Sequence, residues 1–96
     1  MNLYFITWHN DDGENFDWFV REQSFCDAIN NYCVHVNEYE GLKQSEENSW
    51  EITYQGYSKA TQNDAVVFVV PYAEGPAGPV EWDHTISYYA TMTRKK

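Results

Sequence analysis

The chain has 96 residues and a formal net charge of −9, from 15 acidic and six basic side chains. This length suits one compact domain, and a 43% hydrophobic and 18% aromatic composition is not that of a disordered chain. Residues 94–96 are all basic, so residues 1–93 carry −12. A body this acidic repels nucleic acid and anionic membranes and favours basic protein surfaces, although acidity also serves solubility alone.

The first 21 residues predict a β-hairpin. Residues 3–9 are rich in β-branched and aromatic side chains, which is typical of a strand. The polar segment 10–15 contains Asp12-Gly13, a strong hairpin-turn signal. Residues 16–21 then alternate between apolar and polar side chains, as a second strand would.

A helix is expected to follow. Ser24 is the predicted N-cap, Asp27 lies in the first turn, and the helix should end between Asn37 and Gly41. Apolar side chains at helical spacing define its buried face: Phe25, Ala28, Ile29, Tyr32, Cys33 and Val36. Cys26 and Cys33 lie about 10.5 Å apart along such a helix, too far to pair, so we expect two buried thiols in a reducing cytosol.

Three more strands are predicted after a polar loop at 42–48. Residues 50–55 alternate with period two, with a bulge or strand end expected at Gly56. Residues 65–72 form a continuous apolar run typical of a central strand, and 80–89 alternate again. We therefore predict an α+β fold of order β-β-α-β-β-β, an antiparallel sheet of about five strands with one helix on one face. The single domain covers 1–96, and 90–96 are expected to be a polar basic tail.

The motifs of catalysis, metal binding and membrane insertion are missing from the sequence. There is no G-x-S-x-G and no glycine-rich phosphate loop, and segment 10–14 lacks the ligand alternation of a calcium loop. His9, His35 and His84 do not combine with the cysteines at zinc-site spacing. We therefore expect no enzyme, metal or cofactor, although a catalytic carboxylate pair stays open. No signal peptide or span of about 20 apolar residues occurs, so we expect a cytoplasmic protein.

Acidic side chains are the candidate partner-binding residues. A predicted hairpin tip projects its carboxylates, and strand alternation should place Glu51 opposite Trp50, so one sheet face is expected to be wet and acidic. Changing Asp11, Asp12 and Glu14 to amides should then leave stability unchanged or slightly higher. The full candidate set is Asp11, Asp12, Glu14, Asp17, Glu46, Glu47, Glu51, Glu81 and Asp83. The alternative is that they are simply solvated.

Aromatic residues exceed what one small core needs, so some should be exposed where protein hot spots form. The tyrosines expected there are Tyr54, Tyr57, Tyr72, Tyr88 and Tyr89.

Small size, the −9 charge, the acidic segment Asn10-Asp11-Asp12-Gly13-Glu14 and sparse basic residues resemble the small phage-encoded anti-CRISPR and anti-restriction proteins. The resemblance is one of type and assigns no residue a role. It implies an inhibitor that covers the nucleic-acid channel or a subunit interface of a host defence complex, in the host cytoplasm. A separate hypothesis from the acidic residues is nucleic-acid mimicry, in which carboxylates spaced like phosphates occupy a basic surface of a nucleic-acid-binding partner. The alternatives are a self-associating structural or assembly protein and, third, a small enzyme. The sequence leaves the oligomeric state open.

Overall fold

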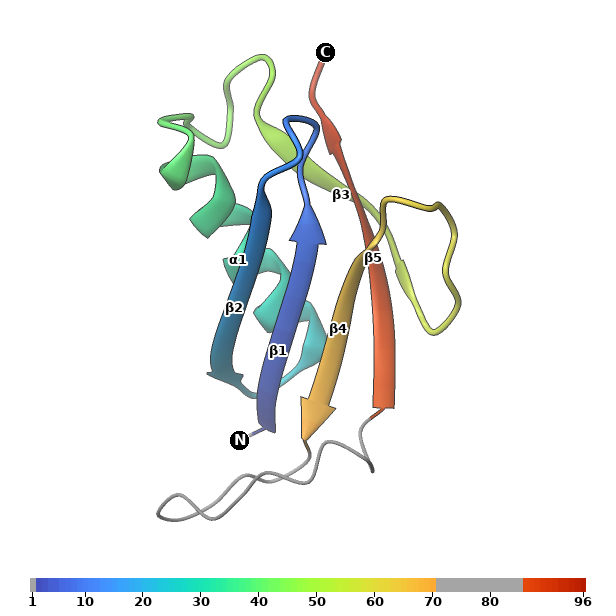
Figure 1. The fold of residues 1–96 in the computed structure, drawn as a ribbon. Helices are drawn as coiled ribbons and strands as arrows, with labels where there is room; N and C mark the ends of the chain where they lie inside the picture. Colours follow the sequence, from blue (N-terminus) through green and yellow to red (C-terminus); the bar gives the residue numbers. More distant parts are fainter. Residues whose placement is uncertain (1, 71–85) are drawn as a thin grey trace.

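The computed structural model describes residues 2–70 and 86–96 (Figure 1). Within them the predicted order β-β-α-β-β-β and the α+β class are confirmed. The elements are β1 Asn2–His9, β2 Asn15–Glu22, α1 Phe25–Tyr39, β3 Trp50–Gly56, β4 Ala65–Val70 and β5 Ile86–Arg94. The expected site residues Glu81 and Asp83, the tyrosine Tyr72 and His84 lie outside the described residues.

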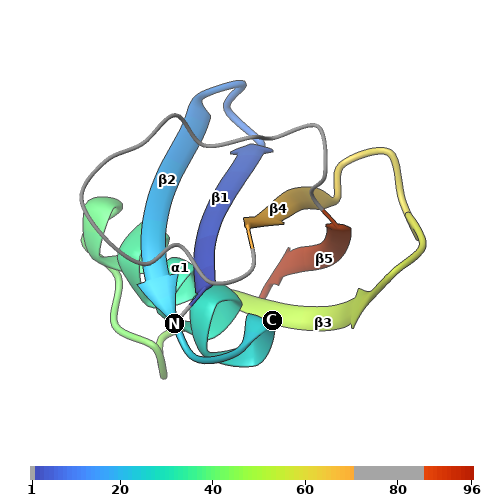
Figure 2. The same ribbon diagram turned by 90° about the horizontal axis from the view of Figure 1, so that it is seen from below.

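The five described strands form one sheet in the order β2-β1-β4-β5-β3, and every neighbouring pair is antiparallel. β4 lies in the centre, as its apolar sequence predicts. The sheet curves around α1, which packs on β2, β1 and β3 (Figure 2). Curvature thus brings α1 beside the edge strand β2 along one side of the molecule (left in Figure 1).

The core lies between α1 and the concave face of the sheet. Every second side chain of β1 from Tyr4 is buried there, as are the predicted apolar positions of the helix except Phe25, which is half-buried. Fully burying an aliphatic or aromatic side chain stabilises the fold by about 1.5–3 kcal/mol. Core residues from these elements and from β4 are Tyr4, Ile6, Trp8, Ala28, Ile29, Tyr32, Cys33, Val36, Val67 and Val69.

The ends of α1 match the sequence prediction. Ser24 Oγ accepts a hydrogen bond from the Asp27 amide at 3.2 Å, which satisfies one N–H group of the first turn. Gly41 follows the helix at a φ of 73°, a conformation that glycine adopts without steric cost.

The buried amide of Asn37 ties α1 to β3. Its Oδ1 accepts from the Trp50 backbone N–H at 2.7 Å, and its Nδ2 donates to the Trp50 carbonyl at 3.1 Å. The Cys33 thiol donates to the same carbonyl at 3.3 Å. A polar residue therefore lies inside the apolar face of the helix because it completes the hydrogen bonding of the strand.

The end of the chain differs from the prediction. Residues 90–94 belong to β5 and pair with β3, whereas a polar tail was expected from residue 90. Ala90 and Met92 are buried, and the threonines between them have β-branched side chains suited to a strand. β3 ends at Gly56, one of the two alternatives expected there, and its register irregularity falls between Ile52 and Tyr54.

Two further expectations fail, one of them only in part. Cys26 is exposed, because the first turn of α1 lies at the rim of the core, where the thiol meets the Gln55 amide at 3.6 Å. The convex sheet face is wet and acidic only in part: Glu51 is exposed opposite buried Trp50, as expected, but a row of phenylalanines crosses three of the strands. Phe5 lies between Phe19 and Phe68, with ring centroids 4.5 and 6.0 Å away. Stacked cross-strand aromatic pairs stabilise such a surface.

Candidate protein-binding face

Arg94, at the end of β5, joins several parts of the chain. Its guanidinium donates to both carboxylate oxygens of Asp11, from Nε at 3.1 Å and from Nη2 at 3.0 Å. Nη2 also donates to Glu40 Oε1 at 3.1 Å, and Nη1 to the Asn48 carbonyl at 2.8 Å. The guanidinium carbon lies 4.2 Å from the ring centroid of Trp50. The hairpin tip, the end of α1 and the loop before β3 are thereby held together.

Asp11 is consequently engaged within the protein. The hydrogen bond from Arg94 lowers the pKa of Asp11 below its ordinary value of 3.8, and the same bond raises the pKa of Arg94. Glu40, the second carboxylate on this arginine, also accepts a hydrogen bond from the Trp50 indole N–H. Removing Asp11 would leave Arg94 with one carboxylate, so the expectation that Asp11, Asp12 and Glu14 can be neutralised together at no cost in stability does not fit the structure.

The hairpin turn is ordered by the buried side chain of Asn10. Its Oδ1 accepts from the Asp12 amide at 3.0 Å and from the Glu14 amide at 2.8 Å, while its Nδ2 donates to Glu14 Oε1 at 3.1 Å. Gly13 supplies the turn with a φ of 80°. Asp12 and Glu14 are therefore exposed on a rigid turn.

Charge is divided unevenly between the two halves of the structure. Residues 10–40, which form the hairpin tip, β2 and α1, contain eight acidic side chains and one basic one, or −7. The described residues 41–70 and 86–96 contain four acidic and five basic side chains, or +1. Among the residues that the structure describes, the negative charge is therefore concentrated on the β2 and α1 side.

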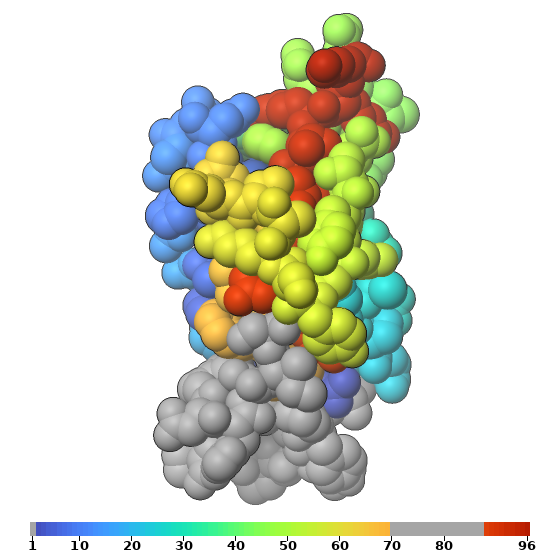
Figure 3. Space-filling view, turned by 90° about the vertical axis from the view of Figure 1, so that its right-hand side faces the viewer, coloured from blue at the N-terminus to red at the C-terminus, as the bar shows by residue number. Residues whose placement is uncertain are grey.

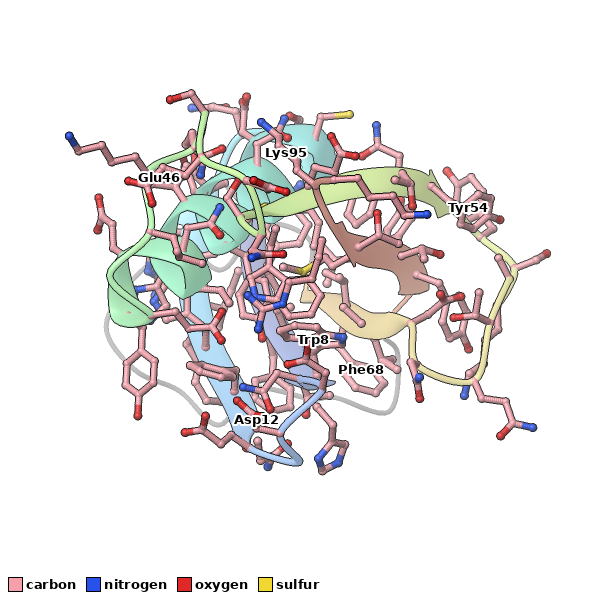
Figure 4. All side chains as sticks on the ribbon, turned by 90° about the horizontal axis from the view of Figure 1, so that it is seen from above. Trp8, Asp12, Glu46, Tyr54, Phe68 and Lys95 are labelled. Atoms are coloured by element: carbon pink, nitrogen blue, oxygen red, sulfur yellow. The ribbon has the colours of Figure 1, made fainter. Side chains whose placement is uncertain are left out.

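The end of the molecule shows this division directly. Figure 3 shows the C-terminal residues gathered with the loop before β3, and Lys95 Nζ donates to the Gln44 carbonyl of that loop. Viewed from above, Lys95 and Glu46 lie on one side of this end and Asp12 on the opposite side (Figure 4). Glu46 and the hairpin therefore do not form one surface.

Aromatic side chains line the junction of β2 and α1, which we call the β2–α1 seam. Trp18 of β2 stacks on His35 of α1 with centroids 5.1 Å apart and planes 7° apart. Phe16 meets Tyr39 edge to face at 4.8 Å, and Tyr39 is 64% exposed.

Carboxylates flank these rings. Tyr39 Oη lies 3.5 Å from Glu14 Oε2, and Asn31 Nδ2 donates to Glu22 Oε1 at 2.6 Å. Glu38 is exposed and lies three residues beyond His35, so helical spacing places it on the same stripe. The seam comprises Glu14, Phe16, Trp18, Glu22, Asn31, His35, Glu38 and Tyr39.

The predicted site residues separate into distinct groups. Asp12, Glu14 and Asp17 are exposed on the acidic half, where Asp17 accepts from the Thr7 hydroxyl at 2.6 Å. Asp11 is paired with Arg94, and the candidates on the balanced half are Glu46, Glu47 and Glu51. The set omits Glu22 and Glu38 and the seam aromatics. A signal existed in the helix, since Asn31, His35 and Glu38 recur at helical spacing on its polar side.

A cleft at the end of the sheet gives less support to catalysis or metal binding than the seam gives to protein binding. A half-open cleft of about 530 Å³ is lined by Trp8, His9, Asn10, Asp11, Trp50, Asn63, Met92, Thr93 and Arg94. The carboxylate in this cleft is that of Asp11, which Arg94 holds ionised, so we assign Asp11 no acid–base role. Oxygens of Asp11, Asp12 and Glu40 lie within 4.8 Å of one another, but the guanidinium pairs with two of these groups and supplies the cation.

Comparison with known protein families, characterised proteins and solved structures finds no match to this chain. Within the described ranges, the 15-residue α1 is too short and too polar to span a membrane.

Proposed function

We propose that this protein binds a basic surface of a nucleic-acid-binding protein and inhibits it by occupying that surface. The supporting observation is the concentration of −7 on residues 10–40, against +1 on the other described residues outside β1. A one-sided negative field orients a protein toward a positive surface and raises its association rate. Nucleic-acid-binding sites are the strongly basic surfaces that such a face would fit.

The hairpin adds rigidity to this charged face, and the seam adds aromatic surface. The hairpin turn is held by Asn10 and its outer positions carry Asp12 and Glu14, so little conformational entropy is lost when these carboxylates meet cations. Tyr39 and Trp18 add aromatic surface of the kind that forms hot spots. In line with the resemblance to phage-encoded inhibitors, CRISPR and restriction complexes are the first partners to test, with the carboxylates in place of phosphates.

Affinity capture tests this function. The immobilised protein is incubated with host lysate, and bound proteins are eluted first with duplex DNA or RNA and then with salt. We expect a nucleic-acid-binding protein in the nucleic-acid eluate, and we expect its nucleic-acid affinity to fall when the purified inhibitor is added. A partner that binds nucleic acid and this protein simultaneously, with neither weakening the other, would contradict the proposal.

Self-association is the second candidate, because β2 and β3 each pair with one described strand and form the edges of the sheet. An edge strand can add a strand from a second copy. Sedimentation over a range of concentrations distinguishes the two: a mass that rises toward a dimer favours assembly, and a constant monomer mass removes it.

A further inference from the structure

We propose that the β2–α1 seam selects arginine rather than lysine side chains on its partner. This inference rests on the proposed function and specifies the chemistry of the basic surface that is bound. The occupant is an arginine-bearing segment of the partner, which places a guanidinium against the Tyr39 ring and beside the carboxylate of Glu14.

The geometry around Tyr39 supports a planar cation. Phe16 meets this ring edge to face at 4.8 Å, so the ring is anchored while 64% of the residue stays exposed. Its hydroxyl lies 3.5 Å from Glu14 Oε2, which places a carboxylate at the rim of the ring. A guanidinium can stack on an aromatic face and donate in its own plane to a carboxylate, whereas an ammonium cannot do both.

The protein holds one of its own arginines in this way. Arg94 lies over the Trp50 ring at 4.2 Å and donates to two carboxylates, those of Asp11 and Glu40. At the seam the corresponding elements are the Tyr39 ring and the Glu14 carboxylate. Trp18 stacked on His35 continues the flat surface along the strand, next to Glu22 and Asn31.

Charge complementarity identifies the occupant as cationic. Tyr39 and its neighbours belong to the segment that carries −7, whereas Tyr57, which is 71% exposed, lies on the half that carries +1. Tyr57 packs on Tyr88 at 4.7 Å, so it is an exposed, supported aromatic residue like Tyr39. It provides a matched control in the same molecule.

The test uses oligoarginine and oligolysine peptides of equal length, titrated into the protein by calorimetry at fixed, low ionic strength. An exposed cation–π contact contributes about 0.5–1 kcal/mol, so we expect oligoarginine to bind about twofold to fivefold more tightly. Tyr39→Ala should bring the two affinities together, and Tyr57→Ala should leave their ratio unchanged. Tyr39→Leu, which retains apolar contact with Phe16, serves if Tyr39→Ala does not fold and should act alike.

The outcomes distinguish a failure of arginine selection from a failure of the proposed binding to basic surfaces. If both peptides bind equally and Tyr39 variants change neither affinity, arginine selection is wrong while binding to basic partners stands. If Tyr57→Ala abolishes the preference and Tyr39→Ala does not, the arginine site is elsewhere. If neither peptide binds, the arginine site and the proposed affinity for basic surfaces both fail.

Discussion

Arg94 and Asp11 lie 83 residues apart in the sequence and are joined by two hydrogen bonds, of 3.1 and 3.0 Å. The pair connects the last strand to the tip of the first hairpin. Because Glu40 and Trp50 contact the same guanidinium, one side chain stabilises the end of the sheet and of the helix. Arg94 therefore neutralises the Asp11 and Glu40 carboxylates and also stabilises the fold.

Replacing Arg94 should destabilise the protein. Arg94→Ala removes hydrogen bonds to two carboxylates and the stacking on Trp50, so we expect a loss of about 1–2 kcal/mol in the free energy of unfolding, measured with urea. Arg94→Lys keeps the charge but not the planar fork, and should recover only part of that loss. Lys59→Ala removes one charge from an exposed site and is the control. Equal stability of Arg94→Ala and Lys59→Ala would show that the junction contributes nothing.

Asp64 should make stability depend on pH in the acid range. Burial opposes its ionisation, but hydrogen bonds from the Thr61 and Thr91 hydroxyls and from the Thr61 and Ala60 amides outweigh burial and lower its pKa below 3.8. Since the folded state has the lower pKa, ionised Asp64 stabilises the fold fully above about pH 4, and this contribution is lost as the pH falls through the folded-state pKa.

Asp64→Asn tests this contribution. It replaces a carboxylate oxygen with an NH₂ group among donors, so we expect a loss of about 1–3 kcal/mol near neutral pH. Unfolding curves measured from pH 7 down to about pH 2 should then show a smaller fall in stability for the variant than for the parent. A variant that loses stability in parallel with the parent over that range would contradict the assignment.

The two cysteines should differ in reactivity. Burial raises the pKa of the Cys33 thiol to about 11, whereas Cys26 is exposed at the start of α1. A thiol reagent at neutral pH should therefore label one cysteine in the folded protein and two after unfolding. Cys26→Ser should remove the fast reaction. Rapid labelling of both thiols in the folded parent would mean that the packing between α1 and β3 is wrong.

Asn37 should contribute to the stability of the protein although it is a polar residue in the core. Asn37→Leu would leave the Trp50 amide without its side-chain partner and the Trp50 carbonyl with the Cys33 thiol alone, at a cost of about 1–3 kcal/mol in stability. Asn30→Leu, at an exposed position of the same helix, is the control and should change stability by less than about 0.5 kcal/mol. A similar effect of the two substitutions would remove the structural role of the buried amide.

Local patterns predicted most of the fold. The Asp12-Gly13 turn, the Ser24 cap and the apolar spacing of α1 depend on neighbours in sequence, and the structure confirms each. The strand character of residues 90–94 was missed, because it depends on pairing with β3 and on the contact of Arg94 with Asp11. Such long-range partners are not visible in the local sequence, although the alternation of Ala90 and Met92 with threonines was a strand signal that the prediction left unused.

The candidate face was predicted only in part, because it also depends on contacts between residues that are distant in sequence. Exposed carboxylates of the hairpin follow from the turn, so Asp12 and Glu14 were found. Which acids are already paired, and which half of the protein is balanced by lysines, follows only from the arrangement of the strands. Tyr39 and Glu38 became candidates once α1 was seen beside β2.

Two matched triple variants test the central claim that partner binding uses the acidic half. Asp12→Asn, Glu14→Gln and Glu38→Gln together remove three charges from that half, and Glu46→Gln, Glu47→Gln and Glu51→Gln remove three from the balanced half. Each is titrated by calorimetry, at low salt, against the partner identified by capture. We predict that the first set weakens binding by about tenfold or more, while the second has little effect. Equal weakening by both sets, or a larger effect of the second, would contradict the account.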